Sequence, residues 1–132
     1  MTEHTLLKGF LERLRRETIG VVLRHSDDVT SGIPDFSFTF LGYTYWVEAK
    51  TSMRGKVKTT ELQRLTMERL GSKGRAVWLI WELKNDKLVG VCFVRPELVK
   101  ADGTYIPFWW TDQFESITEA HERAVKRMLE LQ

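Results

Sequence analysis

The most informative segment of this chain is residues 31–50, Ser-Gly-Ile-Pro-Asp-Phe-Ser-Phe-Thr-Phe-Leu-Gly-Tyr-Thr-Tyr-Trp-Val-Glu-Ala-Lys. Phenylalanines at 36, 38 and 40 alternate with small polar residues, a period-two pattern that predicts a strand with one apolar face. The pair Leu41-Gly42 predicts a tight turn. Residues 43–50 are rich in aromatic and β-branched side chains and predict a second strand that runs back along the first.

This hairpin predicts a cluster of three charged side chains. Successive side chains on a strand point to opposite faces, so Glu48 and Lys50 share one face, while Val47 and Ala49 occupy the other. A hairpin brings the end of its second strand beside the start of its first. We therefore expect Asp35 to lie next to Glu48 and Lys50.

Two adjacent carboxylates indicate a site for a divalent cation. Such groups repel each other at neutral pH, and a bound cation allows both to stay charged. Oxygen ligands from carboxylates, a backbone carbonyl and water suit Mg²⁺ or Mn²⁺ better than zinc. Lys50 would then lie where it can orient an attacking water and stabilise charge on a phosphate.

The alternative without a function is a surface salt bridge between Lys50 and Glu48 or Asp35. A Glu-x-Lys triplet alone favours that interpretation. The preceding Pro-Asp, the strand-turn-strand spacing and the basic residues after Lys50 together favour a functional site.

Bulk properties predict one ordinary domain, residues 1–132. The chain is 42% hydrophobic and 29% charged, with a net charge of +2. Its one cysteine, Cys92, excludes a disulfide framework and a thiolate metal site. No signal peptide or membrane-spanning run is evident, so we expect a cytoplasmic protein (of the host cell if the source is viral) without membrane contact. The segment Gly71-Ser72-Lys73-Gly74 lacks the phosphate-binding P-loop pattern, so no nucleotide cofactor is expected.

Apolar periodicity predicts alternating helices and strands in the rest of the chain. The expected helices cover 5–17, 59–70 and 116–131, and the expected strands cover 19–24, 76–83 and 87–94. Gly71 to Gly74 would end the second helix, Pro96 would stop the last of these strands, and Ser116 with Glu119 predicts a capping box. This order predicts an α/β sandwich in which the strand after the second helix pairs parallel with the hairpin.

The hairpin also resembles a known active-site pattern. Gly32-Ile33-Pro34-Asp35, followed after twelve residues by Glu48-Ala49-Lys50, resembles that of the PD-(D/E)xK nuclease superfamily. The Ser-Gly-Ile-Pro-Asp lead-in and Thr60-x-x-Gln63 are most similar to the virus-type replication-repair nuclease (VRR-NUC) branch, related to Holliday-junction resolvases. The resemblance implies a restriction-endonuclease-like core, a mixed sheet flanked by helices in the order α-β-β-β-α-β, plus a C-terminal hairpin and helix.

The same resemblance implies roles for individual residues. Asp35 and Glu48 would bind the metal, the carbonyl of Ala49 would complete its coordination, and Lys50 would be the catalytic lysine. An acidic residue of the first helix often joins such sites. Helical phase favours Glu3 over Glu12, although Glu17 shares the side of Glu3.

The role of Gln63 has two open interpretations. It resembles the glutamine that stands beside the catalytic lysine in this family. It could equally be an exposed helix glutamine.

A basic segment follows the predicted site. Arg54, Lys56 and Lys58 lie in a predicted loop, residues 51–58, and would contact DNA phosphates without reading sequence. A solvated loop is the alternative. Trp109 and Trp110 could stack on bases, but core packing or a dimer interface is the favoured interpretation.

Together these features predict an Mg²⁺- or Mn²⁺-dependent DNA endonuclease acting on branched or structured DNA such as a Holliday junction. Because a four-way junction is two-fold symmetric, a resolvase of this size would be a homodimer. Two alternatives stay open, a non-catalytic DNA-binding module that retains the nuclease fold and a sequence-specific restriction-type enzyme.

Overall fold

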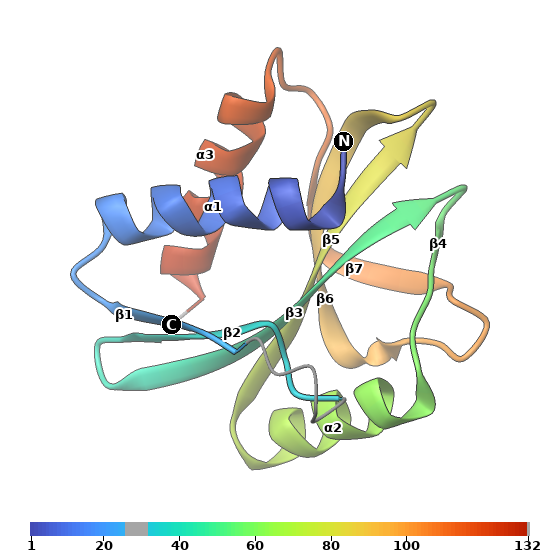
Figure 1. Ribbon diagram of the computed structural model, residues 1–132. Coiled ribbons are helices and arrows are strands. Elements are labelled where there is room, and N and C mark those ends of the chain that lie inside the picture. The colour runs from blue at the N-terminus through green and yellow to red at the C-terminus, as the bar shows by residue number, and fades with distance from the viewer. Residues whose placement is uncertain (26–31, 132) are drawn as a thin grey trace.

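The computed structural model describes residues 1–25 and 32–131, so Ser31 of the segment quoted above lies outside the described residues. Within them, three helices flank one mixed sheet (Figure 1). The helices are α1 (Glu3–Glu17), α2 (Glu61–Lys73) and α3 (Ile117–Glu130). The strands are β1 (Val21–Arg24), β2 (Phe36–Phe40), β3 (Tyr43–Met53), β4 (Lys56–Val57), β5 (Arg75–Lys84), β6 (Lys87–Val99) and β7 (Tyr105–Thr111).

The structure confirms the predicted α/β class and the order α-β-β-β-α-β, with the two-residue strand β4 added before α2. Its strands lie in the order β1-β2-β3-β5-β6-β7, and the short β4 pairs with β3. The predicted parallel pairing is present between β3 and β5, with α2 as the crossover, and the other pairs are antiparallel. None of the described helices is long and apolar enough to cross a membrane.

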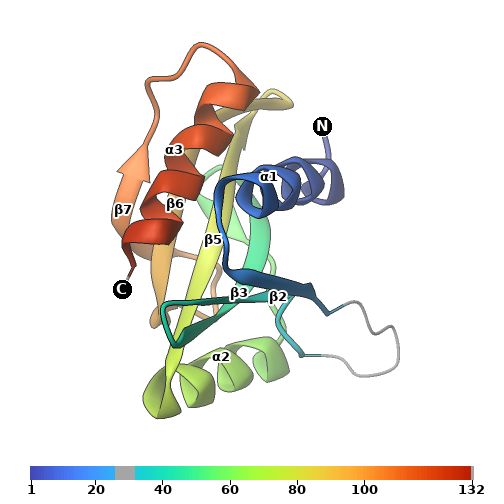
Figure 2. The ribbon, with the colours of Figure 1, turned by 90° about the vertical axis from the view of Figure 1, so that its left-hand side faces the viewer.

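The two faces of the sheet have separate apolar cores. Helices α1 and α3 pack side by side over one face, and α2 covers the other (Figures 1 and 2). The first core contains Phe10, Phe36, Phe38 and Trp81, and the second contains Met67 and Trp78. The alternation of side chains along β3 therefore sends Val47 and Ala49 towards α1 and sends Glu48 and Lys50 to the face of α2.

The hairpin forms as the alternation predicts. Phe36 pairs with Val47 and Phe38 with Tyr45, and both phenylalanines are buried. Leu41 and Gly42 make the turn with positive φ angles of 52° and 82°. A two-residue turn of this kind matches the twist of the strands it joins.

Two predicted boundaries in the second half of the chain are wrong. Helix α2 ends at Lys73, three residues later than expected, and Gly74, the last residue of the predicted terminating segment, caps it. Gly71 lies inside the helix, where its lack of a side chain allows a close approach to Pro96: a Cβ atom at position 71 would lie 2.7 Å from the proline Cγ. Pro96 does not stop β6, which runs on to Val99. The pairing of β6 with β7 is irregular between Val94 and Val99, and such an irregularity accommodates a residue without an N–H group.

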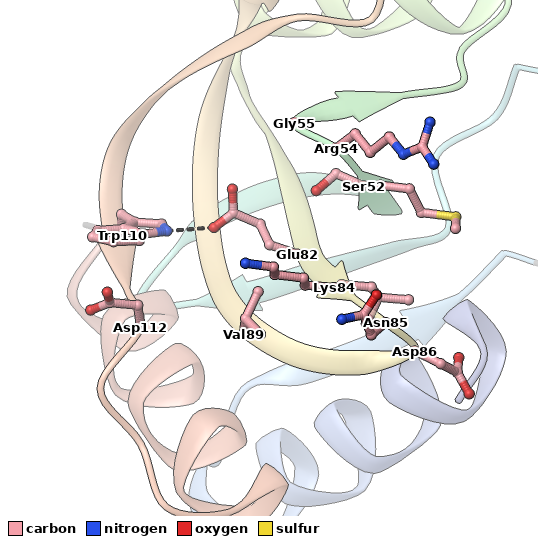
Figure 3. A pocket seen from close by; sticks show the side chains of 12 residues that line it. Ser52, Arg54, Gly55, Glu82, Lys84, Asn85, Asp86, Val89, Trp110 and Asp112 are labelled. Atoms are coloured by element: carbon pink, nitrogen blue, oxygen red, sulfur yellow. Dashed lines mark hydrogen bonds between the residues drawn. The ribbon is translucent and has the colours of Figure 1, made fainter.

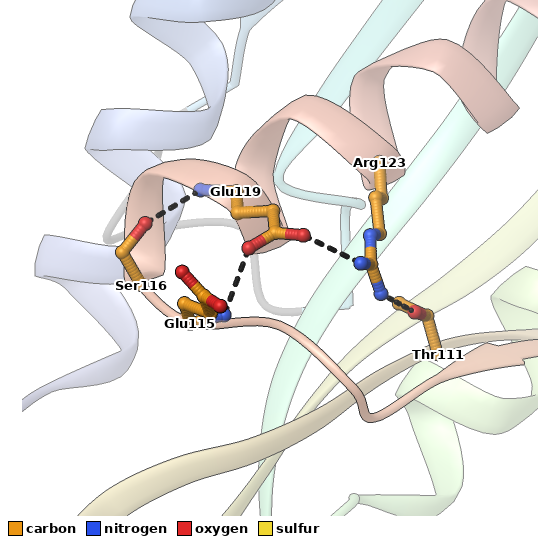
Figure 4. Close-up of polar contacts among 5 residues, drawn as sticks. All are labelled: Thr111, Glu115, Ser116, Glu119 and Arg123. Atoms are coloured by element: carbon orange, nitrogen blue, oxygen red, sulfur yellow. Dashed lines mark hydrogen bonds and ion pairs between the residues drawn. The ribbon is translucent and has the colours of Figure 1, made fainter.

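The helix starts differ in detail from the prediction. Helix α1 begins at Glu3, with the Thr2 hydroxyl accepting a bond from the Thr5 N–H (3.1 Å), two residues before the expected start. Ser116 caps α3 by accepting from the Glu119 N–H (3.1 Å). The Glu119 carboxylate accepts from Glu115 and not from Ser116, so only half of the predicted capping box is present (Figure 4).

Candidate active site

The candidate site lies along one edge of β3, in a gap of the sheet. The β2 pairing ends at Phe36 opposite Val47, and β4 takes over only at Ser52. Two backbone N–H groups between these points bond to carboxylates. Ala49 donates to Asp35 Oδ2 (2.8 Å), and Thr51 donates to Glu3 Oε2 (3.1 Å).

Local structure brings each carboxylate to this edge. Because Phe36 lies opposite Val47, the preceding residue on the first strand, Asp35, comes beside Glu48. Glu3 stands in the first turn of α1, which buried Leu7 and Phe10 anchor to the sheet. The sequence therefore places two acidic residues, 32 positions apart in the chain, at neighbouring points of one strand edge.

Glu48 is the most strongly perturbed carboxyl of the site. It is only 4% exposed and shares the α2 face with Trp78, its partner on β5. Burial, together with a hydrogen bond and negative charge from Asp35, raises the pKa of Glu48 to about 10. The charge of Lys50 opposes this rise without cancelling it. Burial also raises the pKa of Glu3 above its ordinary value, again against the effect of Lys50.

Lys50 supplies the positive charge of the site. It is half-buried, and its charge lowers the pKa of both Glu48 and Glu3. Among the described residues it has no ion-pair partner within 4.0 Å, so the simple surface salt bridge is not what the structure contains. Its ammonium group is available to an anionic ligand.

The donor atoms at this edge fit a small, hard cation. Asp35 and Glu48 supply oxygen atoms, and the Ala49 carbonyl points to the same side of β3 as the Ala49 N–H that bonds Asp35. In residues 1–25 and 32–131, no group of three or more acidic, histidine or cysteine side chains is placed to hold a metal ion. Mg²⁺ characteristically binds through one or two carboxylates and keeps several waters, so a pair of carboxylates suffices.

The chain is similar to a solved VRR_NUC domain. The two share 26% sequence identity with a TM-score of 0.48, over 59% of this chain and 82% of the other. No protein-family model matches the chain, and no curated protein matches it.

Of the acidic residues on α1, the structure places Glu3 at the site edge. Glu17 lies at the opposite end of the helix, where it pairs with Arg13 (3.1 Å). Glu12 is exposed. The predicted role of Glu3 as a metal ligand stays a prediction, because its contacts here are with Thr51.

Gln63 has a structural role in the cap of α2. Its Oε1 accepts from the Thr60 N–H (3.0 Å), and its own N–H donates to the Thr60 hydroxyl (3.1 Å), a complete capping box. This use of the side chain accounts for the Thr-x-x-Gln spacing on physical grounds alone. A role beside Lys50 stays a prediction.

The predicted basic loop is a short hairpin. Strand β3 continues to Met53, Arg54 and Gly55 turn with positive φ, and Lys56 begins β4. Three basic side chains project from it into solvent, Arg54, Lys56 and Lys58. Two of them, Lys56 and Lys58, line a cavity of about 550 Å³ together with Glu3 and Lys50. The hairpin therefore brings Lys56 and Lys58 into the same hollow as Glu3 and Lys50.

Sequence reasoning missed a polar cluster beside the site. The Tyr105 hydroxyl donates to Glu82 (2.6 Å) and lies 2.9 Å from the Ser52 hydroxyl, while the Trp110 indole N–H also donates to Glu82. Burial and the Glu82 contact raise the pKa of Tyr105, which keeps its proton on the phenol. An isolated glycine in a predicted strand, Gly90, was the available signal, since it indicates a close approach by other atoms.

The tryptophan pair divides between the two faces of the sheet. Trp109 is half-buried and packs on Phe93 with ring centroids 5.5 Å apart, as the core interpretation expects. Trp110 is 51% exposed and does not belong to the core.

Proposed function

We propose that this protein is a divalent-metal-dependent nuclease that hydrolyses phosphodiester bonds in DNA. The observation that carries the proposal is the meeting of Asp35 and Glu48 at an open strand edge beside Lys50. A buried carboxylate pair is unfavourable unless a cation or a proton neutralises it. A role in binding a metal ion would explain why Asp35 and Glu48 lie together in spite of this cost.

The proposed division of labour follows the positions of the side chains. Asp35, Glu48 and the Ala49 carbonyl would hold Mg²⁺ or Mn²⁺, which when bound supplies an acidified water and neutralises charge on a phosphate oxygen. Lys50 would orient the attacking water and stabilise the negative charge that develops on the phosphate. Lys56 and Lys58 would hold the phosphates on either side of the cleaved bond.

Branched DNA is the proposed substrate. Phosphate-binding cations and the lack of an evident groove-reading motif in the sequence favour recognition of shape over base sequence. Two-fold symmetric junctions would require a homodimer, whereas a monomer would act on flaps or nicks. Sedimentation at working concentration separates these two forms of the proposal.

The decisive experiment compares labelled linear, flap and four-way DNA in Mg²⁺, Mn²⁺ or chelator. We expect cleavage only with metal, and little with Asp35→Asn, which keeps an oxygen for the Ala49 N–H but removes the charge. Lys50→Ala should slow cleavage by about 10²- to 10³-fold, the usual cost of losing one electrostatic stabiliser. Both variants should retain DNA binding, and Lys8→Ala, on the exposed side of α1, should cut normally. Undiminished cutting by Asp35→Asn would refute the assignment.

A non-catalytic DNA-binding module is the second candidate. The raised pKa of Glu48 favours it, because a proton can neutralise the carboxylate pair without a metal. Calorimetric titration with Mg²⁺ or Mn²⁺ discriminates the two candidates, since the module predicts no metal binding and the nuclease predicts binding that Asp35→Asn weakens.

A further inference from the structure

Trp110 lies in register with Lys50 on the same face of the sheet. Lys50 pairs with Ile80, Ile80 with Cys92, and Cys92 with Trp110. Directly opposed residues of neighbouring strands share a face, so these four side chains form one row. With about 4.8 Å between strands, Trp110 lies roughly 14 Å from Lys50 across the sheet.

The indole of Trp110 is held in a fixed orientation. Its N–H donates to Glu82, which also accepts from the Tyr105 hydroxyl, and Glu82 and Trp110 line one side of a cavity (Figure 3). Gly90 lies opposite Glu82, and any side chain there would collide with the Glu82 carboxylate and crowd the Trp110 nitrogen. The contact uses the edge of the indole, and half of the side chain stays exposed.

The cavity beside Trp110 is large enough for a nucleotide, and two cations and three acidic residues line it. It measures about 700 Å³, within the usual range for small-molecule sites. Arg54 and Lys84 supply positive charge, and Asn85 supplies an amide (Figure 3). Of its acidic residues, Glu82 is engaged by Trp110 and Tyr105, Asp86 pairs with the N-terminal amine (3.5 Å), and Asp112 is exposed.

This cavity adjoins the cavity that Lys50 lines. Met53 lines it and also lines the cavity that holds Glu3 and Lys50. A smaller cavity between them is lined by Glu3 and Met53 as well.

A second cavity lies at the same edge strand on the side of α3, where Glu130 also lines it and pairs with Arg127 (3.4 Å). This cavity, of about 320 Å³, is lined by Trp110 and by Arg123, Lys126 and Arg127 of α3. Arg123 is held in place by the Thr111 hydroxyl (2.9 Å) and by Glu119 (Figure 4). Thr111 and α3 lie on the face opposite the Trp110 indole, so the positive charge beside the indole itself comes from Arg54 and Lys84.

Given the nuclease function proposed above, we propose that the Trp110 cavity binds an unpaired nucleotide of a single-stranded DNA arm that leaves the active site. The base stacks on the indole, and Arg54 and Lys84 hold the adjacent phosphates. An aromatic platform with cations beside it is the arrangement that binds single strands without reading their sequence. A peptide would meet the same indole but would not require the two cations, Arg54 and Lys84, that line the cavity with it.

Binding in EDTA tests this inference apart from cleavage. Fluorescence anisotropy would compare a blunt duplex with the same duplex bearing a single-stranded arm. We expect the wild type to prefer the arm, and Trp110→Ala to weaken binding of the armed duplex by about 5- to 100-fold, with the blunt duplex unaffected. Trp110→Phe should keep most of the preference. Ile106→Ala, an exposed position of β7 outside both cavities, is the matched control.

A second variant keeps the test decisive if Trp110→Ala does not fold. Val89 lines the same cavity and is exposed, so Val89→Phe fills the space while leaving Trp110 and Glu82 in place. It should also abolish the preference. The fluorescent base 2-aminopurine, placed at successive arm positions, should be quenched at one position in the wild type and in Trp110→Phe.

Two results would overturn the inference. These are an unchanged arm preference in folded Trp110→Ala and Val89→Phe, and the lack of any preference in the wild type. If the wild type prefers the arm but cuts no DNA with either metal, the cleavage proposal fails and the nucleotide site stands. If it cuts without the preference, only the nucleotide site fails.

Discussion

At the scale of single residues, Glu48 is a buried carboxyl group whose pKa is strongly raised. Its pKa of about 10 lies far above the ordinary value of 4.5. As pH rises past 4.5, the unfolded chain loses this proton while the folded protein keeps it. The free energy of unfolding should therefore fall as pH rises from 4.5 towards about 10.

Glu48→Gln tests whether Glu48 causes this pH dependence, because glutamine keeps a donor for Asp35 and cannot ionise. In EDTA we expect the variant to melt above the wild type at pH 8, with the difference shrinking towards pH 5. Added Mg²⁺ should raise the melting temperature of the wild type and leave that of the variant nearly unchanged. Melting curves that stay parallel across this pH range would contradict the burial argument.

At the scale of elements, the contact between α2 and β6 depends on a glycine within the helix. Gly71→Ala places a methyl group 2.7 Å from the rigid ring of Pro96, and the resulting shift should lower the free energy of unfolding by roughly 1–3 kcal/mol. Gly74→Ala is the matched control. Its φ of −167° suits any residue, and its Cβ would meet only the Leu70 carbonyl, at 3.6 Å. Urea denaturation of both variants measures the difference, and equal midpoints would remove Pro96 as the reason for Gly71.

Elements also show which features a sequence can reveal. The β2–β3 hairpin was predictable, because alternation and a two-residue turn are local signals, and its register alone brings Asp35 beside Glu48. The start of α1 at Glu3 also depends on a local signal, because the neighbouring Thr2 caps the helix.

The cluster at Glu82 was not predictable in the same way. It requires the registers of β5, β6 and β7 together, and the irregular pairing around Pro96 lies between two of them. A proline usually indicates the end of a strand, so Pro96 predicted too early an end for β6.

At the scale of the whole molecule, the distribution of charge decides which surface meets DNA. The net charge is only +2, so long-range attraction to DNA is weak and binding must depend on local groups of cations. Arg54, Lys56 and Lys58 project from the β3–β4 hairpin at the active-site cavity, whereas Lys8, Arg15 and Arg16 are exposed on α1.

Replacing one set of cations at a time locates the DNA. Removing one side chain that neutralises a phosphate should lower the slope of log K against log salt concentration by about 0.9 on duplex DNA. Substitution of Arg54, Lys56 and Lys58 by glutamine should therefore reduce the slope by up to about 2.7, while substitution of Lys8, Arg15 and Arg16 should leave it unchanged. Both triple variants lower the net charge from +2 to −1, so a difference between them reports position and not total charge. An equal reduction of the slope in the two would mean that DNA contacts the α1 side as much as the hairpin, and the cleavage site would then have to be sought elsewhere on the protein.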